Sequence, residues 1–401
     1  MLVLFRFKNY GPFKEEVVFD MRAIRAYKEH SYNLINEENR EPLLKVVSIY
    51  GANASGKTHF VNAYSSFLDI VLNSFKKNNK DESSGSILQM NHTPFCFDES
   101  KDNSTEFEAV YRKGDSEYKY GFIYDDCRIK YEWLYKRSLN TNRQSRIFER
   151  TAKTIELGSS VKNSCEKYLE DIDLDVLALS FFSSLKLKTN VFSDVVYCIS
   201  DLLPISLSCK GEGDYLLRTY FEKSFNKVEK QRLLKFLHAI DVGIKDIDVE
   251  KNDNKVAVYT WHIGKNGKKY KISFDLESDG TKRAIAVYSI ARIAVLYERG
   301  LIVDEFNSQL HPLLQKYIID LFYDEKAKGQ LIYTTHDTFL LDKQYMRRDQ
   351  IWFVNKDNFG EASLYSLAEY KIRNDKSFGK DYLGGIYGGI PILKKFSFEE
   401  E

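Results

Sequence analysis

The sequence predicts an α/β fold with a mixed sheet, a subdomain of antiparallel strands and a helical insertion. Three observations lead to this prediction. Residues 45–68 read as a buried strand, a glycine-rich loop and an amphipathic helix. Short stretches of alternating polarity, separated by turn residues, fill residues 105–137. Apolar residues then recur at helical spacing between residues 160 and 240.

Composition narrows the classes of protein to which the chain can belong. At 401 residues it is too long for one compact core, which predicts about two or three subdomains. Its 59 Lys and Arg residues balance 58 Asp and Glu residues, which argues against a uniformly basic protein that coats nucleic acid. A local basic patch remains compatible with these numbers, so a nucleic-acid partner stays possible. Five cysteines without CxxC spacing indicate reduced thiols.

The chain is expected to be cytoplasmic and to make no contact with a membrane. Its N-terminus carries a charge by residue 6 and has no cleavage-site pattern. The most apolar stretch, residues 284–303, contains Arg292, Glu298 and Arg299. It therefore predicts a buried helix followed by a strand rather than a membrane span.

The segment GANASGKT, residues 51–58, has the spacing of a phosphate-binding loop and follows the apolar strand 46–50. Its glycines let the backbone fold tightly, so that N–H groups and the N-terminus of the next helix point at phosphate oxygens. Lys57 is expected to reach the β- and γ-phosphates of ATP, and the Thr58 hydroxyl to ligate Mg²⁺. The predicted nucleotide-binding residues of the loop are Gly51, Asn53, Ser55, Gly56, Lys57 and Thr58.

Strands are predicted on both sides of this unit. Residues 1–20 read as two strands around an NYGP turn, and strands 106–112, 117–124 and 128–137 follow the unit. Beyond the helical interval, VAVYTWHIG and KYKISFDL read as strands that an Asn-Gly turn at residues 266–267 joins.

These patterns divide the chain into three parts. Residues 1–150 form a first lobe with the phosphate loop and antiparallel strands, residues 151–245 a helical insertion, and residues 246–401 a second lobe. The helix faces of the insertion lack the sustained heptads of a long coiled coil, so the insertion is expected to be a compact projection.

The second lobe contains residues that complement a phosphate loop. Asp304 and Glu305 follow the apolar strand 301–303, which is the pattern of a Walker B element. An aspartate at a strand end can hold Mg²⁺, and a glutamate beside it can orient or deprotonate an attacking water. An exposed acidic pair is the alternative, and the separate phosphate loop favours the catalytic interpretation. His336 follows the apolar strand 331–335. A lone histidine is usually structural or solvent-exposed, but at a strand end downstream of a Walker B pair it is placed to contact a γ-phosphate.

The segment ESDGTKR, residues 277–283, lies between a predicted strand and an apolar helix. Ser278 and Gly280 offer a hydroxyl and free N–H groups to a phosphate at this helix N-terminus. A plain N-cap, in which Ser278 or Asp279 caps the helix, is the alternative, and both roles are compatible.

The order of these elements resembles that of an ABC-type ATPase head, closest to the RecF/SMC/OLD-like branch. The motifs NYGPF, GANASGKT, EWLY, SDGTKR and DEFNSQLHP resemble more narrowly the AAA-domain ATPases of bacterial abortive-infection, or anti-phage, systems. RloA-like proteins and the ATPase subunits of Septu- and PARIS-type defence belong to that group. The similarity extends over most of the chain, including the C-terminal YLGGIYGGIP.

The resemblance implies a role for the ESDGTKR segment. Ser278 and Gly280 match the serine and second glycine of the ABC signature, whereas Glu277 and Asp279 replace the usual leucine and first glycine. In such ATPases two heads close head-to-tail, and each signature completes the ATP site of the other subunit. The resemblance therefore implies a homodimer or higher homo-oligomer with ATP between the heads. It also implies a D-loop at residues 308–312, while Gln89 is a Q-loop candidate that no motif fixes.

The resemblance also implies a biological role. We favour a sensor or regulatory ATPase that controls a partner effector, such as a nuclease or toxin, in anti-phage defence. One alternative is a RecF-like ATPase of DNA repair or recombination. Another is an ATP-gated nuclease, for which Arg232 and His238 offer the loose spacing of a HEPN-type pair.

Overall fold

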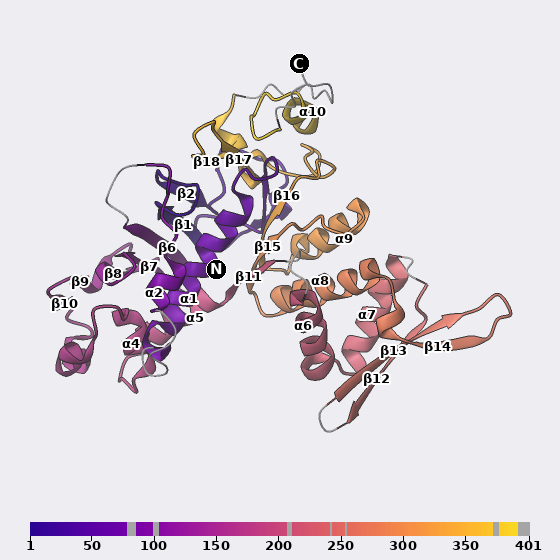
Figure 1. Cartoon of the computed structure of the whole chain (residues 1–401), viewed down its shortest axis with the longest axis horizontal. Helices are drawn as coiled ribbons and strands as arrows, with labels where there is room; N and C mark the ends of the chain where they lie inside the picture. The colour runs from indigo at the N-terminus through magenta and orange to yellow at the C-terminus, as the bar shows by residue number, and fades with distance from the viewer. Residues whose placement is uncertain are drawn as a thin grey trace, which may run out of the picture.

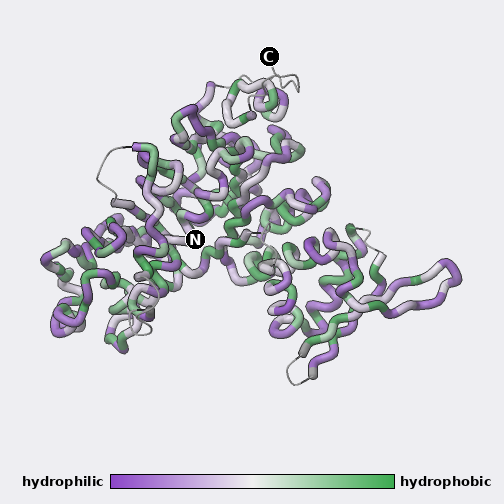
Figure 2. Tube along the Cα trace, viewed as in Figure 1, coloured by the Kyte–Doolittle hydropathy of each residue, from purple (hydrophilic) through white to green (hydrophobic). Residues whose placement is uncertain are grey.

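The structure is a computed structural model that describes residues 1–77, 86–98, 104–206, 211–240, 243–252, 255–371 and 377–391. Figure 1 shows a central body in which two large sheets enclose one long helix, with a smaller sheet and its helices extending to one side. Hydrophobic residues line the strands and helices of the central body, and hydrophilic residues occupy the outer turns (Figure 2).

A six-stranded sheet carries the phosphate loop. Its strands, in order across the sheet, are β11 (Leu202–Ser206), β15 (Gly300–Asp304), β16 (Gln330–Thr335), β5 (Val46–Tyr50), β17 (Ile351–Lys356) and β18 (Ala362–Ser366). All neighbours run parallel except β17 and β18, which run antiparallel, so the predicted mixed sheet is confirmed. Strands β5, β15 and β16 are buried along their whole length, as is typical of parallel strands covered on both faces.

An antiparallel sheet of seven strands lies on the other side of helix α1 (Lys57–Lys77). Its strands, in order, are β10 (Ile155–Leu157), β9 (Gln144–Thr151), β8 (Ile129–Ser138), β7 (Ser116–Tyr124), β6 (Thr105–Lys113), β1 (Leu2–Lys8) and β2 (Val17–Asp20). Strand β1 lies between β2 and β6. The hairpin predicted for residues 1–20 and the strands predicted for residues 105–137 therefore form a single sheet.

Aromatic side chains fix helix α1 against the antiparallel sheet. Phe60, Tyr64 and Phe67 of the helix are buried. The ring of Phe5 on β1 lies 5.2 Å from that of Tyr64 and 5.8 Å from that of Phe67, and both pairs are inclined, as aromatic rings prefer. Since α1 begins within the phosphate loop, this packing also positions the loop.

A smaller antiparallel sheet has three strands, β12 (Asp246–Asn252), β13 (Lys255–Ile263) and β14 (Lys269–Ser273), paired in that order. Helices α6 (Glu212–Thr219), α7 (Lys227–Ala239) and α8 (Asp279–Leu296) share a hydrophobic core with it. The predicted hairpin is confirmed, because Gly267 has a φ of 74° in the turn between β13 and β14, a conformation that favours glycine.

The remaining elements are short or flank the sheets. They are α2 (Ile87–Asn91), α3 (Lys162–Cys165), α4 (Ala178–Ser184), α5 (Val191–Ser200), α9 (Pro312–Tyr323), α10 (Phe378–Leu383), β3 (Leu34–Ile35) and β4 (Leu43–Leu44). Short 3-10 segments lie at Ser31–Asn33, Glu166–Asp171, Phe274–Leu276, Arg348–Gln350 and Leu367–Glu369, and a π turn at Tyr220–Ser224. No helix in the described part of the chain has the length and apolar character needed to cross a bilayer.

The interval 151–245, predicted as a helical insertion, contains α3 to α7 and also two strands. Strand β10 extends the antiparallel sheet, and β11 pairs with β15 in the six-stranded sheet. Pro204 is tolerated in β11 because this strand lies at a sheet edge. Buried residues of α4 and α5 share a hydrophobic core with α1. Part of the interval is thus built into the large sheets, and the division of the chain at residues 150 and 245 stays a prediction.

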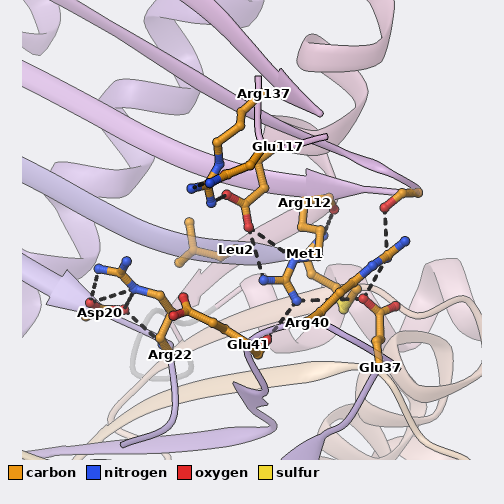
Figure 3. Close-up of polar contacts among 12 residues, drawn as sticks. Met1, Leu2, Asp20, Arg22, Glu37, Arg40, Glu41, Arg112, Glu117 and Arg137 are labelled. Atoms are coloured by element: carbon orange, nitrogen blue, oxygen red, sulfur yellow. Dashed lines mark hydrogen bonds and ion pairs between the residues drawn. The ribbon is translucent and has the colours of Figure 1, made fainter. Parts of the chain in front are cut away.

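A buried ion-pair network joins the start of the chain to the antiparallel sheet (Figure 3). Arg112 Nη2 lies 3.0 Å from Glu117 Oε1, and Arg137 pairs with the same carboxylate. The Met1 amino group donates a hydrogen bond to the backbone oxygen of Arg112 at 3.0 Å. Because Arg112 and Glu117 are both buried, each offsets the loss of hydration of the other.

Gln330 links the two large sheets. Its Oε1 accepts a hydrogen bond from the backbone N–H of Leu2 at 2.7 Å, and its Nε2 donates to the backbone oxygen of Leu2 at 3.0 Å. The side chain is buried, so both of its polar ends are satisfied where water is excluded. This pair of bonds holds the first residue of β16 against β1.

Glu132 on β8 holds the start of helix α4. Its buried carboxylate accepts hydrogen bonds from the backbone N–H groups of Ala178 at 2.8 Å and Leu179 at 2.9 Å, and from the Tyr120 hydroxyl at 3.0 Å. Burial raises the pKa of Glu132, and the positive charge of Arg150 opposes this shift. The carboxylate replaces a cap from within the helix, since residue 177 contributes no side-chain hydrogen bond there.

We expect Glu132→Gln to lower the free energy of unfolding by about 2–4 kcal/mol. The amide nitrogen of glutamine is a donor, and it would replace one of the two oxygens that accept hydrogen bonds here. Glu166→Gln is the matched control, since Glu166 is exposed and lies 3.8 Å from Lys162. It should change the free energy by about 0.5 kcal/mol or less. Urea unfolding followed by circular dichroism measures both variants. Equal changes in the two variants would contradict the role of Glu132.

Candidate nucleotide-binding site

The phosphate loop connects β5 to α1 and is tightly folded. Gly56 has a φ of 119°, and Ala54 also has a positive φ, of 61°. A Cβ atom on Gly51 would lie 2.6 Å from Ser55 Oγ and 2.7 Å from the backbone oxygen of Val354, so no side chain fits there. Gly51 and Gly56 are therefore required by the backbone geometry, as the sequence predicts.

Two polar side chains of the loop are directed inward. Lys57 Nζ donates hydrogen bonds to the backbone oxygens of Gly51 at 2.7 Å and Ala52 at 2.9 Å. Burial lowers the pKa of Lys57, and the nearby carboxylates of Asp304 and Glu305 oppose this shift. The buried Ser55 hydroxyl has no hydrogen-bond partner among the described residues. Asn53 lies exposed in the loop.

Asp304 meets the phosphate loop at the carboxyl ends of the parallel strands. Thr58 Oγ1 donates a hydrogen bond to Asp304 Oδ2 at 2.8 Å. Thr334 Oγ1 donates to the other carboxylate oxygen at 2.5 Å. Asp304 is only 1% exposed, so its contact with the buried Thr334 is desolvated, whereas the contact with the exposed Thr58 is partly open to solvent. The two residues predicted to ligate Mg²⁺ therefore have their oxygens side by side.

Glu305 follows Asp304 in a left-handed backbone conformation, with a φ of 51°. For a residue other than glycine this conformation costs on the order of 1 kcal/mol. The backbone N–H of Glu305 donates to Thr334 Oγ1 at 2.8 Å, which holds the turn. Thr334 thus orients both acidic residues. The positive φ turns the backbone away from strand β15 at Glu305. The residue remains partly exposed.

His336 lies exposed just beyond β16 and contacts Asn307. Thr335 Oγ1 donates to Asn307 Oδ1 at 3.0 Å, which turns the amide nitrogen toward the imidazole. The distance between that nitrogen and His336 Nε2 is 3.1 Å. With the amide as donor, Nε2 accepts, so the ring proton resides on Nδ1. Asn307 therefore sets the orientation and tautomer of His336.

Ser278 caps helix α8. Its hydroxyl accepts a hydrogen bond from the backbone N–H of Thr281 at 3.1 Å and lies 2.8 Å from the Thr281 hydroxyl. The capping alternative is therefore what the structure shows within one chain. Ser278 and Gly280 line a pocket, whose other residues are Ala239, Ile240, Thr281, Ala284, Gln309, His311, Leu313, Leu314 and Tyr317. The segment 308–312 thus lies beside the signature segment.

Glu277, which precedes Ser278, is anchored to the small sheet. Glu277 Oε1 accepts a hydrogen bond from Thr260 Oγ1 at 2.5 Å and lies 2.7 Å from His262 Nε2. Its side chain is only 8% exposed. The residue that replaces the usual leucine of the signature therefore fixes this segment to strand β13.

The sequence profile of one protein family, described as "AAA domain, putative AbiEii toxin, Type IV TA system", matches residues 46–342. The match includes the phosphate loop, the signature segment, the acidic pair and His336. The chain belongs to this family. The resemblance to abortive-infection ATPases is thereby confirmed. No curated protein shows a significant match to the sequence.

Two solved structures of SMC heads are similar to this AbiEii-type AAA domain over nearly the whole chain. The SMC head bound to the C-winged helix domain of ScpA is 13% identical, with a TM-score of 0.43, and 91% of this chain and 97% of that chain are covered. The SMC head domain from Thermotoga maritima is 12% identical, with a TM-score of 0.39 and coverage of 92% and 99%. The family match and the strand order described above identify the fold as a P-loop ABC-type ATPase head.

The residues of the AbiEii-type AAA domain at this sheet edge fit ATP and Mg²⁺. The unpartnered Ser55 hydroxyl lies within the loop, among the described residues, where a phosphate oxygen would satisfy it. Thr58 and Asp304 supply hard oxygen ligands of the kind that Mg²⁺ prefers. Lys57 supplies the positive charge beside them.

The predicted residues form two groups. The loop residues, Asp304, Glu305 and His336 gather at the carboxyl edge of the six-stranded sheet, whereas Ser278 and Gly280 lie at the start of α8. Gln89 is exposed on α2, and its assignment stays a prediction. Sequence reasoning missed Thr334 and Asn307; a hydroxyl within the apolar strand before His336 was the available signal for Thr334.

Proposed function

We propose that this protein binds ATP with Mg²⁺ and hydrolyses it as an ABC-type ATPase. The contact between Thr58 and Asp304 carries the proposal, because it joins the phosphate loop to the Walker B strand. Mg²⁺, when bound, would neutralise charge on the β- and γ-phosphates. Thr58 and Asp304 would hold it, and Lys57 would contact the same phosphates.

Glu305 is the proposed general base. A carboxylate that follows the metal-binding aspartate can accept the proton of a water that attacks the γ-phosphorus. Thr334 contacts both the backbone N–H of Glu305 and the carboxylate of Asp304, so one hydroxyl links the two acidic residues. His336, oriented by Asn307, is the proposed contact to the γ-phosphate.

We further propose that two copies close around ATP. Ser278 and Gly280 would bind the γ-phosphate held by the partner's phosphate loop. The support is their placement at a helix N-terminus, where N–H groups favour anions, in a pocket next to the 308–312 segment. A homodimer, or a higher homo-oligomer with the same contact, would then contain complete sites.

In the cell, we propose a cytoplasmic sensor or regulatory subunit that controls a nuclease or toxin in anti-phage defence. The family description, which names a toxin of a toxin–antitoxin system, supports this role. The gene and its neighbours, expressed in a phage-sensitive host, should lower plaque formation, and the Lys57→Ala form should not. Equal protection by both forms would contradict an ATP-dependent role.

The nuclease alternative has less support. Arg232 and His238 both lie on α7, six residues apart, which places them roughly 120° apart around the helix. Arg232 pairs with Glu229 at 2.5 Å, and this pairing engages its guanidinium. The two side chains therefore do not converge on one substrate atom.

Asp304→Asn should remove the Mg²⁺ dependence of ATP binding. The amide retains the shape and one oxygen but loses the charge that binds a divalent ion. We expect the ratio of the ATP dissociation constants without and with Mg²⁺ to fall by about tenfold or more in the variant. The dissociation constant without Mg²⁺ should stay near that of wild type. Calorimetric titration with and without EDTA measures this. A full Mg²⁺ effect in the variant would contradict metal binding at Asp304.

A further inference from the structure

The hairpin of β13 and β14 projects away from the rest of the molecule (Figure 1). Strand β12 pairs with β13 only as far as the Asp246–Trp261 pair. Beyond it, His262 faces Tyr270 and Ile263 faces Lys269 in a ribbon of two strands. We call residues 262–270 the arm. The pairing ends at the hydrogen bond from the Gly264 backbone N–H to the backbone oxygen of Lys268, at 3.0 Å. At about 3.3 Å per residue, the three paired residues on each side of the arm reach roughly 10 Å.

The arm has a concentrated positive charge. Residues 255–273 contain five lysines and no aspartate or glutamate. Lys271 is paired with Glu250 at 2.8 Å. Lys265, Lys268 and Lys269 are exposed at the tip, and none of them makes an ion pair within the described residues. Figure 2 shows this end of the hairpin as hydrophilic. Three lysines so close together repel one another, and an external polyanion would offset that repulsion.

We propose that the arm binds double-stranded DNA by entering its major groove, with the tip lysines on the flanking phosphates. The major groove of B-form DNA is about 12 Å wide and 8.5 Å deep and admits a two-stranded β-ribbon. The arm is long enough to reach its floor. The major groove of an RNA duplex is too narrow for side chains to read, so the shape favours DNA. Lysine contacts to phosphates would make the affinity strongly dependent on salt.

The base of the arm is joined to the proposed ATPase site. His262 and Thr260 hold Glu277, the residue before Ser278. A DNA duplex bound to the arm would therefore be linked, through these two contacts, to the segment that caps α8. DNA binding itself requires neither ATP nor a second copy, so it can fail or succeed independently of the proposed hydrolysis.

The test compares wild type with a triple variant, Lys265→Ala, Lys268→Ala and Lys269→Ala. The matched control is Lys153→Ala, Lys186→Ala and Lys188→Ala, which removes the same charge from exposed positions elsewhere. Fluorescence anisotropy with a labelled duplex of about 30 base pairs, at several salt concentrations, measures the affinity of each. Circular dichroism and ATP titration verify that all three proteins are folded.

We expect the arm variant to lose about tenfold or more in DNA affinity, and the control to stay within about twofold of wild type. The slope of log K against log salt should become shallower by roughly 2–3 in the arm variant only. A duplex RNA of the same sequence should bind more weakly than DNA. Equal losses in the two triple variants, no DNA binding by wild type, or equal binding of DNA and RNA would overturn the proposal.

Discussion

Glu305→Gln is expected to lower ATP turnover by about 100-fold or more while ATP affinity stays close to that of wild type. The substitution keeps the shape of the side chain and removes the basic oxygen and its charge, and a positioned general base contributes about 10²–10⁴-fold. The backbone at this position is held by Thr334, so the loop should not rearrange. Phosphate release and calorimetric titration measure turnover and affinity.

Glu298→Gln is the matched control for this variant. Glu298 is exposed and, like Glu305, has a positive φ, of 56°. Its substitution should leave turnover within about twofold of wild type. Turnover at the wild-type rate in Glu305→Gln would contradict the role of Glu305 as the base.

The same variant tests the proposed closure of two copies. With hydrolysis slowed, ATP should stabilise a dimer that size-exclusion chromatography with light scattering detects. Ser278→Arg places bulk at the proposed γ-phosphate contact, and it should prevent this dimer in the Glu305→Gln background. Crosslinking between the phosphate loop and the signature segment replaces the mass measurement if other surfaces already form a dimer. Absence of ATP-dependent closure in both assays would leave Ser278 as a helix cap only.

Lys57→Ala should lower ATP turnover by at least about 100-fold and weaken ATP binding, because it removes the charge beside the phosphates. It also removes the two hydrogen bonds that Lys57 Nζ donates to the backbone oxygens of Gly51 and Ala52. Phosphate release and calorimetry measure both effects.

Lys45→Ala separates this effect from the loss of a buried lysine in general. Lys45 lies just before β5, at the end opposite the loop, and its Nζ donates to the backbone oxygen of Asp324 at 2.7 Å. Burial lowers the pKa of Lys45, as it does that of Lys57. The Lys45→Ala protein should be less stable but should still bind ATP. Loss of binding in both variants would mean that folding, not phosphate contact, explains the result.

Local motifs made much of this site predictable. Strand β5 is the strand predicted at 46–50, and the hairpin of β13 and β14 forms at the predicted turn, because each is encoded by a few adjacent residues. The contact between Thr58 and Asp304 was implied by the motifs and is present. The catalytic roles of Glu305 and His336 stay predictions.

Contacts between distant segments were not predictable from periodicity. Pro204 and the surrounding helical pattern concealed strand β11, since a proline is tolerated only at an edge that the sequence does not reveal. Glu277 was interpreted through the signature motif alone. Its partners, Thr260 and His262, precede it by 17 and 15 residues on another strand, and only the sheet register brings them together.

The strand order has a consequence for how the protein is made. Strand β5 carries the phosphate loop but pairs only with β16 and β17 in the described sheet, both from the last third of the chain. Thr58 and Asp304 are 246 residues apart. A ribosome that adds about 5–20 residues per second separates their synthesis by roughly 12–50 s. We therefore expect an emerging chain to be unable to hold nucleotide until it is nearly complete, so that interrupted translation yields inactive fragments.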